Sequence, residues 1–198
     1  MIEFPNKKYN IIYADPAWSF GSKSYQDGNR DMIDIQKAHY STMTEQEICS
    51  LPVQDIADDN CILFMWVTDS HLKEALNVIN AWGFTYKTIG FTWVKQYASG
   101  SYCYNFSPYV LKSTEICLIA TKGKLKEIKK RNDIKGLVFA ERTKHSKKPQ
   151  EVRNRIIDMC KNLPRIELFA REKAEGWDVW GNEITTNSRE VQRSLREV

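Results

Sequence analysis

The chain has 198 residues, of which 42% are hydrophobic and 27% are charged, and its formal net charge is +4. This length suits one domain with a sizeable core, and the composition excludes a disordered or fibrous protein. No apolar run approaches a membrane span and the N-terminus lacks a secretory signal, so we expect a cytoplasmic protein. The mild positive charge permits a nucleic-acid partner without requiring one.

The cysteines and histidines point away from disulfides and metals. Five cysteines and three histidines are present, with no C-x-x-C pair and no histidines at the spacing of metal ligands. An odd count of cysteines, several of them in apolar segments, is typical of reduced and mostly buried thiols. We therefore predict free thiols and assign no metal.

The first elements are a strand, a long polar segment and a short helix. Residues 10–14 form the first predicted strand, which ends at Asp15. Residues 19–37 are rich in Gly, Ser and Asp and are too many for an ordinary connection, so we expect a functional or mobile loop. Thr44 followed three residues later by Glu47 makes a capping box, which predicts a short helix starting at Thr44.

The middle of the chain alternates strands with a helix. The continuous apolar run Cys61–Val67 predicts a strand buried on both faces. The next predicted helix ends at Gly83. Further strands are predicted over Thr88–Val94 and Glu115–Thr121, and a tyrosine-bearing irregular segment, Gln96–Tyr109, separates them. The apolar residues of the predicted helix fall on one face and are Leu72, Ala75, Leu76 and Ile79.

The last third adds a helix and two strands. Pro149 suits the first turn of a helix with Val152, Ile156 and Cys160 on its apolar face. Arg165–Ala170 is the last long buried strand, and Trp177–Trp180 follows it. The residues beyond position 184 are polar, so we predict a single domain over residues 1–183 and a polar tail over residues 184–198.

The alternation of strands and helices predicts an α/β fold with three αβα layers and a mostly parallel sheet. In such sheets ligands bind beyond the carboxyl ends of the strands. The residues that follow predicted strands, and that we therefore expect near one rim, are Asp15, Thr68, Lys95 and Arg171.

The segment Tyr13-Ala14-Asp15-Pro16-Ala17-Trp18 has the features that methylation of an amino group, such as that of adenine, requires. The amino nitrogen of adenine is a poor nucleophile, because its lone pair is delocalised into the ring. The Asp15 carboxylate and the Pro16 carbonyl can accept its two hydrogens and stabilise the charge that develops on nitrogen. The indole ring of Trp18 can stack on a base that has been flipped out of a nucleic-acid double helix. The alternative interpretation is a turn after a strand, with Trp18 in the core.

Several further segments match a known family in order. They are YADPAW, HYSTMTEQEI, LFMWVT, WGFTYKTIGFTWVK, STEICLIATKG, HSKKPQEV and RIELFAREKAEGWDVWGNE. The chain resembles the adenine N6-methyltransferases of the family named for the seventy-kilodalton subunit of the messenger-RNA adenosine methyltransferase. The resemblance implies a permuted Rossmann-like methyltransferase that uses S-adenosylmethionine and transfers its methyl group directly to a flipped-out adenine. We expect DNA rather than RNA as the substrate, because a compact chain without appended RNA-binding modules suits a bacterial or phage DNA enzyme.

The resemblance also implies roles for single residues. Asp15, Pro16 and Trp18 match the catalytic tetrapeptide. The residues that match the pocket of the target base are Tyr40, Glu115 and Lys148. The residues assigned to the cofactor are Asp15, Lys148, Arg171, Asn182 and Glu183. Apart from the resemblance, Tyr109 in the tyrosine-bearing segment is a further candidate for stacking on a base.

The sequence departs from the family in three places. Ala17 replaces the second proline of the usual Asp-Pro-Pro-Trp tetrapeptide, so we expect a less rigid loop. Asn182-Glu183 stands where eukaryotic members have Asn-Gln. The acidic and apolar residues that hold the cofactor adenine in eukaryotic members lie upstream of the catalytic motif, and we expect this chain to hold that ring in another way or only loosely.

Residues 122–148 are rich in Lys and Arg, which favours phosphate contact over an ordinary solvated surface. Three alternatives stay open. They are an RNA adenine methyltransferase, a non-catalytic nucleic-acid-binding paralogue, and an enzyme that methylates a protein amide. The oligomeric state is also open, and a homodimer is compatible with the sequence.

Overall fold

The computed structural model describes residues 3–19, 42–107, 109–143, 147–182 and 184. The strands are β1 (Tyr9–Ala14), β2 (Ala57–Val67), β3 (Thr85–Gln96), β4 (Thr114–Lys122), β5 (Leu137–Glu141), β6 (Arg165–Leu168) and β7 (Asp178–Trp180). The α-helices are α2 (Glu45–Cys49), α3 (Val53–Ile56), α4 (Leu72–Ala81) and α5 (Gln150–Met159), and two 3₁₀ turns are η1 (Asp69–His71) and η2 (Leu125–Glu127).

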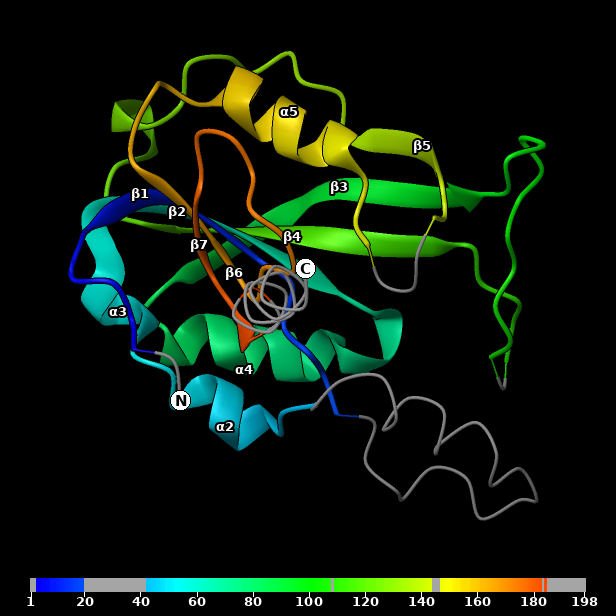
Figure 1. Ribbon diagram of the computed structural model, residues 1–198, viewed down its shortest axis with the longest axis horizontal. Helices are drawn as coiled ribbons and strands as arrows, with labels where there is room; N and C mark the ends of the chain where they lie inside the picture. The colour runs from blue at the N-terminus through cyan, green and yellow to red at the C-terminus, as the bar shows by residue number, and fades with distance from the viewer. Residues whose placement is uncertain (1–2, 20–41, 108, 144–146, 183, 185–198) are drawn as a thin grey trace, which may run out of the picture.

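The strands form one sheet in the order β5-β3-β4-β2-β1-β6-β7. Helix α5 covers one face, and α2, α3 and α4 lie on the other face (Figure 1). The expected three-layer α/β architecture is therefore confirmed.

The sheet is mostly parallel, with one reversed strand. β1 pairs in parallel with β2 and with β6, β6 pairs in parallel with β7, and β3 pairs in parallel with β5. β4 is antiparallel to both β2 and β3. The amino end of β4 therefore lies at the same rim as the carboxyl ends of the other strands. The pattern of apolar residues does not reveal strand direction, so the sequence did not predict this reversal.

Strand β5 lies in the basic stretch, and the sequence pattern does not predict it. It is an edge strand whose Val138 side chain is buried, whereas Leu137 and Phe139 are about half exposed. Five residues with one buried side chain give little periodic signal. Pairing with β3 supplies the hydrogen bonds that make this segment a strand.

Two hydrophobic clusters lie on the two faces of the sheet. Leu63 and Met65 of β2 enter the cluster beneath α2, α3 and α4. Phe64 and Trp66 enter the cluster beneath α5. Side chains alternate between the faces of a strand, so a strand covered on both sides must be apolar at every position. The continuous apolar run of β2 has this cause.

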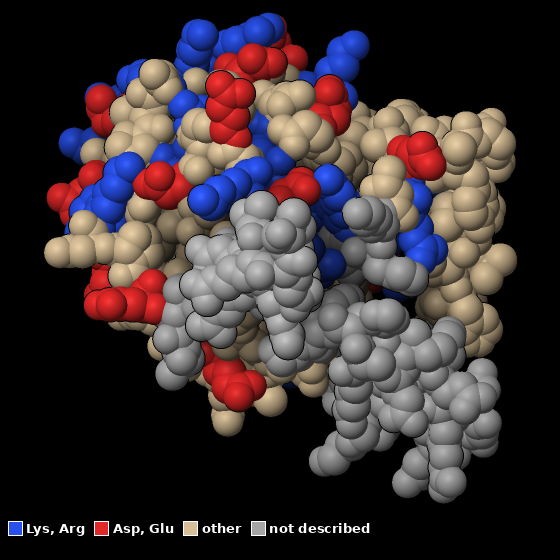
Figure 2. Space-filling view, viewed as in Figure 1, with Lys and Arg blue, Asp and Glu red and all other residues tan. Residues whose placement is uncertain are grey.

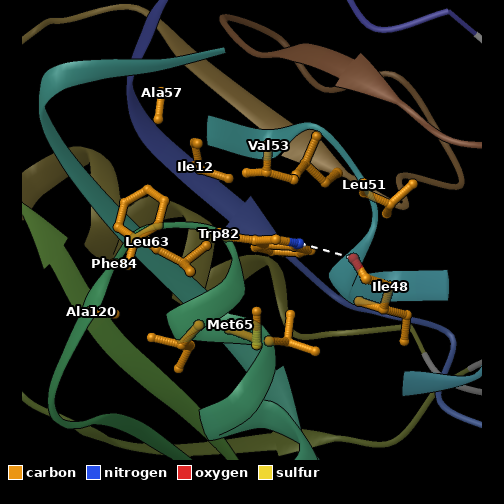
Figure 3. Packing of buried hydrophobic residues seen from close by; sticks show 14 of the residues in the cluster. Ile12, Ile48, Leu51, Val53, Ala57, Leu63, Met65, Trp82, Phe84 and Ala120 are labelled. Atoms are coloured by element: carbon orange, nitrogen blue, oxygen red, sulfur yellow. Dashed lines mark hydrogen bonds between the residues drawn. The ribbon is translucent and has the colours of Figure 1, made fainter. Parts of the chain in front are cut away.

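Helix α2 begins as the capping box predicts. The Thr44 backbone N–H donates to Glu47 Oε2 at 2.7 Å, and the Glu47 N–H donates to Thr44 Oγ1 at 3.3 Å. The end of α2 is tied to α4 through the indole of Trp82, which is fully buried and donates from Nε1 to the Ile48 carbonyl at 2.9 Å. Figure 3 shows this indole at the centre of the packed side chains, between the two helices.

The chain after β6 and the chain after β7 are pressed together. The predicted strand Arg165–Ala170 ends at Leu168, because Phe169 adopts a φ of 61° that a strand does not allow. The Ala170 N–H donates to the Trp180 carbonyl at 3.0 Å. A Cβ on Gly181 would overlap the backbone of Ala170, so only glycine fits this crossing. Both segments therefore emerge side by side at the carboxyl ends of their strands.

Among the described residues, no helix is long and apolar enough to cross a membrane. All five cysteines are free thiols, and four of them are buried. The division between a domain and a tail at residue 183 stays a prediction, because residues 183 and 185–198 lie outside the described part of the chain.

Candidate active site

The tetrapeptide that begins at Asp15 lies at the centre of the rim. β1 lies between β2 and β6. The later strands β4, β3 and β5 are added outward beyond β2, and β7 is added outward beyond β6, so the strand order reverses at β1. Such a switch point opens a crevice at the carboxyl ends of the strands, which is where open α/β sheets bind ligands. Asp15 is the first residue after β1, so the sheet itself directs the tetrapeptide to this place.

Four charged side chains meet at this rim. Lys148 Nζ lies 2.8 Å from Asp15 Oδ2 and 3.3 Å from Glu115 Oε2. Lys95 Nζ lies 2.5 Å from Glu115 Oε1. The positive and negative groups alternate in the order Lys95, Glu115, Lys148 and Asp15, which we name the charge cluster. Its members come from β3, from β4, from the segment before α5 and from the end of β1.

The charge cluster is almost closed to water, which changes its proton affinities. Between 10% and 20% of each side chain is exposed. Burial raises the pKa of Asp15 above its ordinary value, although the Lys148 ammonium partly opposes this. Burial also disfavours the Glu115 anion, but the ammonium groups of Lys148 and Lys95 hold its pKa below the ordinary value. The two carboxylates outweigh burial and raise the pKa of Lys148.

Two tryptophans form the floor of the charge cluster. Lys148 Nζ lies 5.6 Å from the ring centre of Trp66, and Lys95 Nζ lies 5.3 Å from that of Trp93. The two indoles contact each other edge to face, with their centres 6.4 Å apart. Ammonium groups over aromatic faces are stabilised without a counter-ion. The floor therefore stabilises the two ammonium groups in a buried place.

Trp18 packs into the core with one face covered. The residue is 8% exposed, and its ring stacks on His71 with centres 5.6 Å apart and planes 20° apart. His71 Nδ1 is 2.8 Å from Thr68 Oγ1, and its Nε2 is 3.4 Å from the Ser19 carbonyl. Stacking on a target base stays a prediction, and it would have to use a part of the indole that His71 does not cover.

The Pro16 carbonyl already accepts one hydrogen bond. The Trp18 backbone N–H donates to it at 2.9 Å. A carbonyl oxygen has two lone pairs, so it retains the capacity to accept a second hydrogen. The role of Pro16 as an acceptor for the target amino group is therefore compatible with this turn and stays a prediction.

The other predicted site residues are divided. Arg171 follows β6 at the rim, close enough for its charge to lower the pKa of Asp15. Asn182 follows Gly181 at the same rim. Tyr109 is 94% exposed, so it has almost no contact with the other described residues and lies outside the buried cluster. Tyr40 and Glu183 lie outside the described residues.

Lys95 and His71 contact site residues but had no role in the sequence analysis, which expected Lys95 only near the rim. The signal for Lys95 was present, because Phe91, Trp93 and Lys95 occupy alternate positions of one strand and are all buried. A lysine that continues the inward face of a strand is unusual, since lysines are almost never fully buried without a partner. No comparable pattern marked His71.

The fold divides the basic stretch of residues 122–148. Lys122 pairs with Cys61 near the start of β2, and Lys129 bridges to Cys160 at the end of α5. Both lysines lie at the amino ends of the parallel strands, on the opposite side of the sheet from the rim that carries Asp15. Lys147, by contrast, is near the rim and is 2.8 Å from Glu172. Basic and acidic side chains are intermingled on the face that Figure 2 shows. Phosphate contact by this stretch stays a prediction.

Comparison with known proteins identifies the class. Residues 9–183 match the MT-A70 family. The chain is 37% identical over 200 residues to the Type II methyltransferase M.MunI of a Mycoplasma species, covering 96% of this chain and 83% of that protein. It is 28% identical to human N(6)-adenine-specific methyltransferase METTL4 and 26% identical to human N(6)-adenosine-methyltransferase catalytic subunit METTL3. These matches cover 90% and 89% of this chain but 38% and 28% of the two human proteins.

The chain therefore belongs to the MT-A70 family of S-adenosylmethionine-dependent methyltransferases. The family, the fold class and the cofactor expected from the sequence are confirmed.

Proposed function

We propose that this chain transfers a methyl group from S-adenosylmethionine to the N6 amino group of adenine in DNA. The observation that carries the proposal is the buried charge cluster, which presents the Asp15 carboxylate at the switch point of a methyltransferase sheet. A carboxylate held in this way can accept a hydrogen bond from the N–H of a weakly nucleophilic amino group.

S-adenosylmethionine supplies an electrophilic methyl group when it is bound. The residues of this chain have the complementary task of preparing the acceptor. Asp15 and the Pro16 carbonyl accept the two hydrogens of the amino group and orient its lone pair. As the nitrogen–carbon bond forms, the amino nitrogen becomes positive and the nearby carboxylate stabilises it. The sulfur–methyl bond breaks with its electron pair left on sulfur, and the nitrogen passes one proton to water, which leaves a neutral N6-methyladenine.

The chemistry of the rim fits the cofactor. Its carboxylate needs a cation, which Arg171 offers after β6. Its amino group needs an acceptor, which Asp15 offers, and its ribose hydroxyls suit the amide of Asn182 and the side chain of Glu183. Lys148 joins the cofactor side to the base side, because it binds Asp15 and Glu115 together. Tyr40 and Glu115 complete the pocket of the target base in this proposal.

DNA is the favoured substrate because M.MunI, a Type II methyltransferase, matches nearly the whole chain and most of its own length. An RNA substrate is the second candidate, and it is favoured by the similarity to the adenosine methyltransferase METTL3. A non-catalytic scaffold would explain Ala17, but it would not need a buried carboxylate at the rim. The cytoplasm is the location that belongs to this proposal, since both the cofactor and DNA are available there in a bacterium.

The proposal is tested by incubating the protein with methyl-labelled cofactor and unmethylated double-stranded DNA, single-stranded DNA or RNA of the same sequences. Nucleosides are then separated and counted. We expect label in N6-methyldeoxyadenosine, and none with the Asp15→Ala variant. Label found only in N6-methyladenosine from RNA would show that RNA, and not DNA, is the substrate. Cofactor binding without label in any nucleic acid would favour the scaffold, and the Ala17→Pro variant would then show whether a stiffer loop restores activity.

A further inference from the structure

Lys95 is the member of the charge cluster that has no assigned role. It lies at the end of β3, its residue is 8% exposed, and its ammonium group contacts Glu115 and the face of Trp93. It is separated from Asp15 by Glu115 and Lys148, so it does not bind the target amino group directly in the arrangement described above.

The charges of the cluster balance as a set of four. Two ammonium groups alternate with two carboxylates, and Lys148 is shared between Asp15 and Glu115. Lys148 is nearer to Asp15, at 2.8 Å, than to Glu115, at 3.3 Å. Lys95 is the closer partner of Glu115, at 2.5 Å. Without Lys95, two buried carboxylates would compete for one ammonium group.

We propose that Lys95 is a positioning residue of the methyl-transfer site: by neutralising Glu115 it leaves Lys148 to Asp15, and so keeps the Asp15 carboxylate ionised and directed toward the target amino group. The inference rests on the proposed function for the role of Asp15. The effect of Lys95 on the ionisation of Asp15 depends only on residues of this chain. Lys95 would act on Asp15 through Glu115 and Lys148, which lie between them in the charge cluster.

The surroundings of Asp15 support this dependence. The charged or titratable groups that face it are Lys148 before α5, Glu115 and Cys117 on β4, Tyr13 on β1, Glu167 on β6 and Arg171 after β6. The Glu115 anion raises the pKa of Asp15, whereas Lys148 and Arg171 lower it. Removing the nearest cation from Glu115 leaves Lys148 as the one remaining cluster ammonium, which Glu115 and Asp15 must then share. Asp15 must then take up a proton at a higher pH.

The test follows the protonation of Asp15 by carbon NMR in protein labelled at the aspartate carboxyl carbons, without cofactor or nucleic acid. Asp15→Asn identifies the signal. We expect Lys95→Met to raise its titration midpoint by about one pH unit. Lys95→Arg keeps the cation and should restore the midpoint. In a Glu115→Gln background the Lys95→Met change should have little effect, because Lys95 acts through Glu115.

Lys112→Met is the matched control, since Lys112 binds Asp69 at 3.0 Å outside the charge cluster, and it should leave the midpoint unchanged. If the inference holds, the acid limb of the pH profile of kcat/KM moves upward with the NMR midpoint. An unchanged midpoint in a folded Lys95→Met protein would overturn it, and Lys95→Gln serves the same purpose if the methionine variant does not fold. If the protein methylates no adenine, the proposed function fails, whereas the NMR titration still decides whether Lys95 controls Asp15.

Discussion

Single residues at the rim owe their properties to neighbours that are distant in sequence. Asp15 and Lys148 are 133 positions apart, yet the ammonium group of one is hydrogen-bonded to the carboxylate of the other. Trp18 is three residues from Asp15 in the sequence, but its ring contacts His71 from the turn after β2. The chemistry of the tetrapeptide therefore depends on side chains supplied by other elements.

Asp15→Asn is the most direct change at this scale, because it keeps the shape of the side chain and removes its charge. We expect the single-turnover rate of adenine methylation to fall by at least about 100-fold, or about 3 kcal/mol, since a preorganised acceptor is lost from the transition state. The control is Asp178→Asn at the start of β7, whose carboxylate binds Lys7 near solvent. Equal rates in wild type and Asp15→Asn would remove Asp15 from the mechanism.

Arg171→Ala tests the cofactor side of the rim. Loss of a charge-assisted contact with the cofactor carboxylate should weaken binding of S-adenosylmethionine by about tenfold or more, or about 1.4 kcal/mol. Isothermal titration calorimetry measures this. Arg165→Ala, at the opposite end of β6, should bind as wild type does. The assignment fails if the two variants bind alike.

At the scale of elements, short helices are held by what they contact. Helix α2 has five residues, too few to be stable alone, so its capping box and its bond to α4 fix its position. The end of α2 leads through α3 into β2, the strand beside β1. The packing of these helices therefore supports the strand pair that presents Asp15.

Trp82→Phe tests that support. It removes the Nε1 donor to the Ile48 carbonyl and reduces a fully buried ring, so we expect the free energy of unfolding to fall by about 2–4 kcal/mol. Urea denaturation measures the change. Leu72→Ala on the same helix, at a side chain that is 39% exposed, should cost less than about 1 kcal/mol. Similar losses in both variants would show that the α2–α4 contact is not specific.

At the scale of the whole molecule, buried thiols link stability to pH. Burial raises the pKa of Cys61, in the cluster beneath α2, α3 and α4, to about 12, and it does the same for Cys160, in the cluster beneath α5. The unfolded chain loses these protons near pH 9.0, the ordinary value. Their contribution is therefore fully present below pH 9 and is lost as the pH rises toward 12.

The free energy of unfolding should accordingly fall above pH 9, by up to about 1.4 kcal/mol per pH unit for each such thiol. Denaturation curves between pH 8 and pH 11 measure the slope. Cys61→Ala and Cys160→Ala should each make it shallower, whatever they cost at pH 7 through lost packing. Cys49→Ala, at a partly exposed position, should change the slope much less. A slope that is the same in all four proteins would contradict this link.

Local signals determined much of the architecture. The apolar run of β2, the capping box at Thr44 and the proline before α5 each depend on neighbours within a few residues, and the structure confirms the elements that they predict. The resemblance to the family implied the methyltransferase fold and the cofactor. These elements can be predicted from the sequence because strand burial and helix capping depend on residues that are close together along the chain.

Only the tertiary structure decided the reversal of β4, the edge strand β5, the place of Lys95 in the charge cluster and the pairing of charges within it. Strand direction follows from which partner satisfies the backbone hydrogen bonds, and no periodicity of Thr114–Lys122 carries that information. Lys95 and Glu115 are 20 positions apart, and Lys148 and Asp15 are 133 apart. Their charges interact strongly because folding brings them together and removes water from between them, and both effects arise only when distant parts of the chain meet.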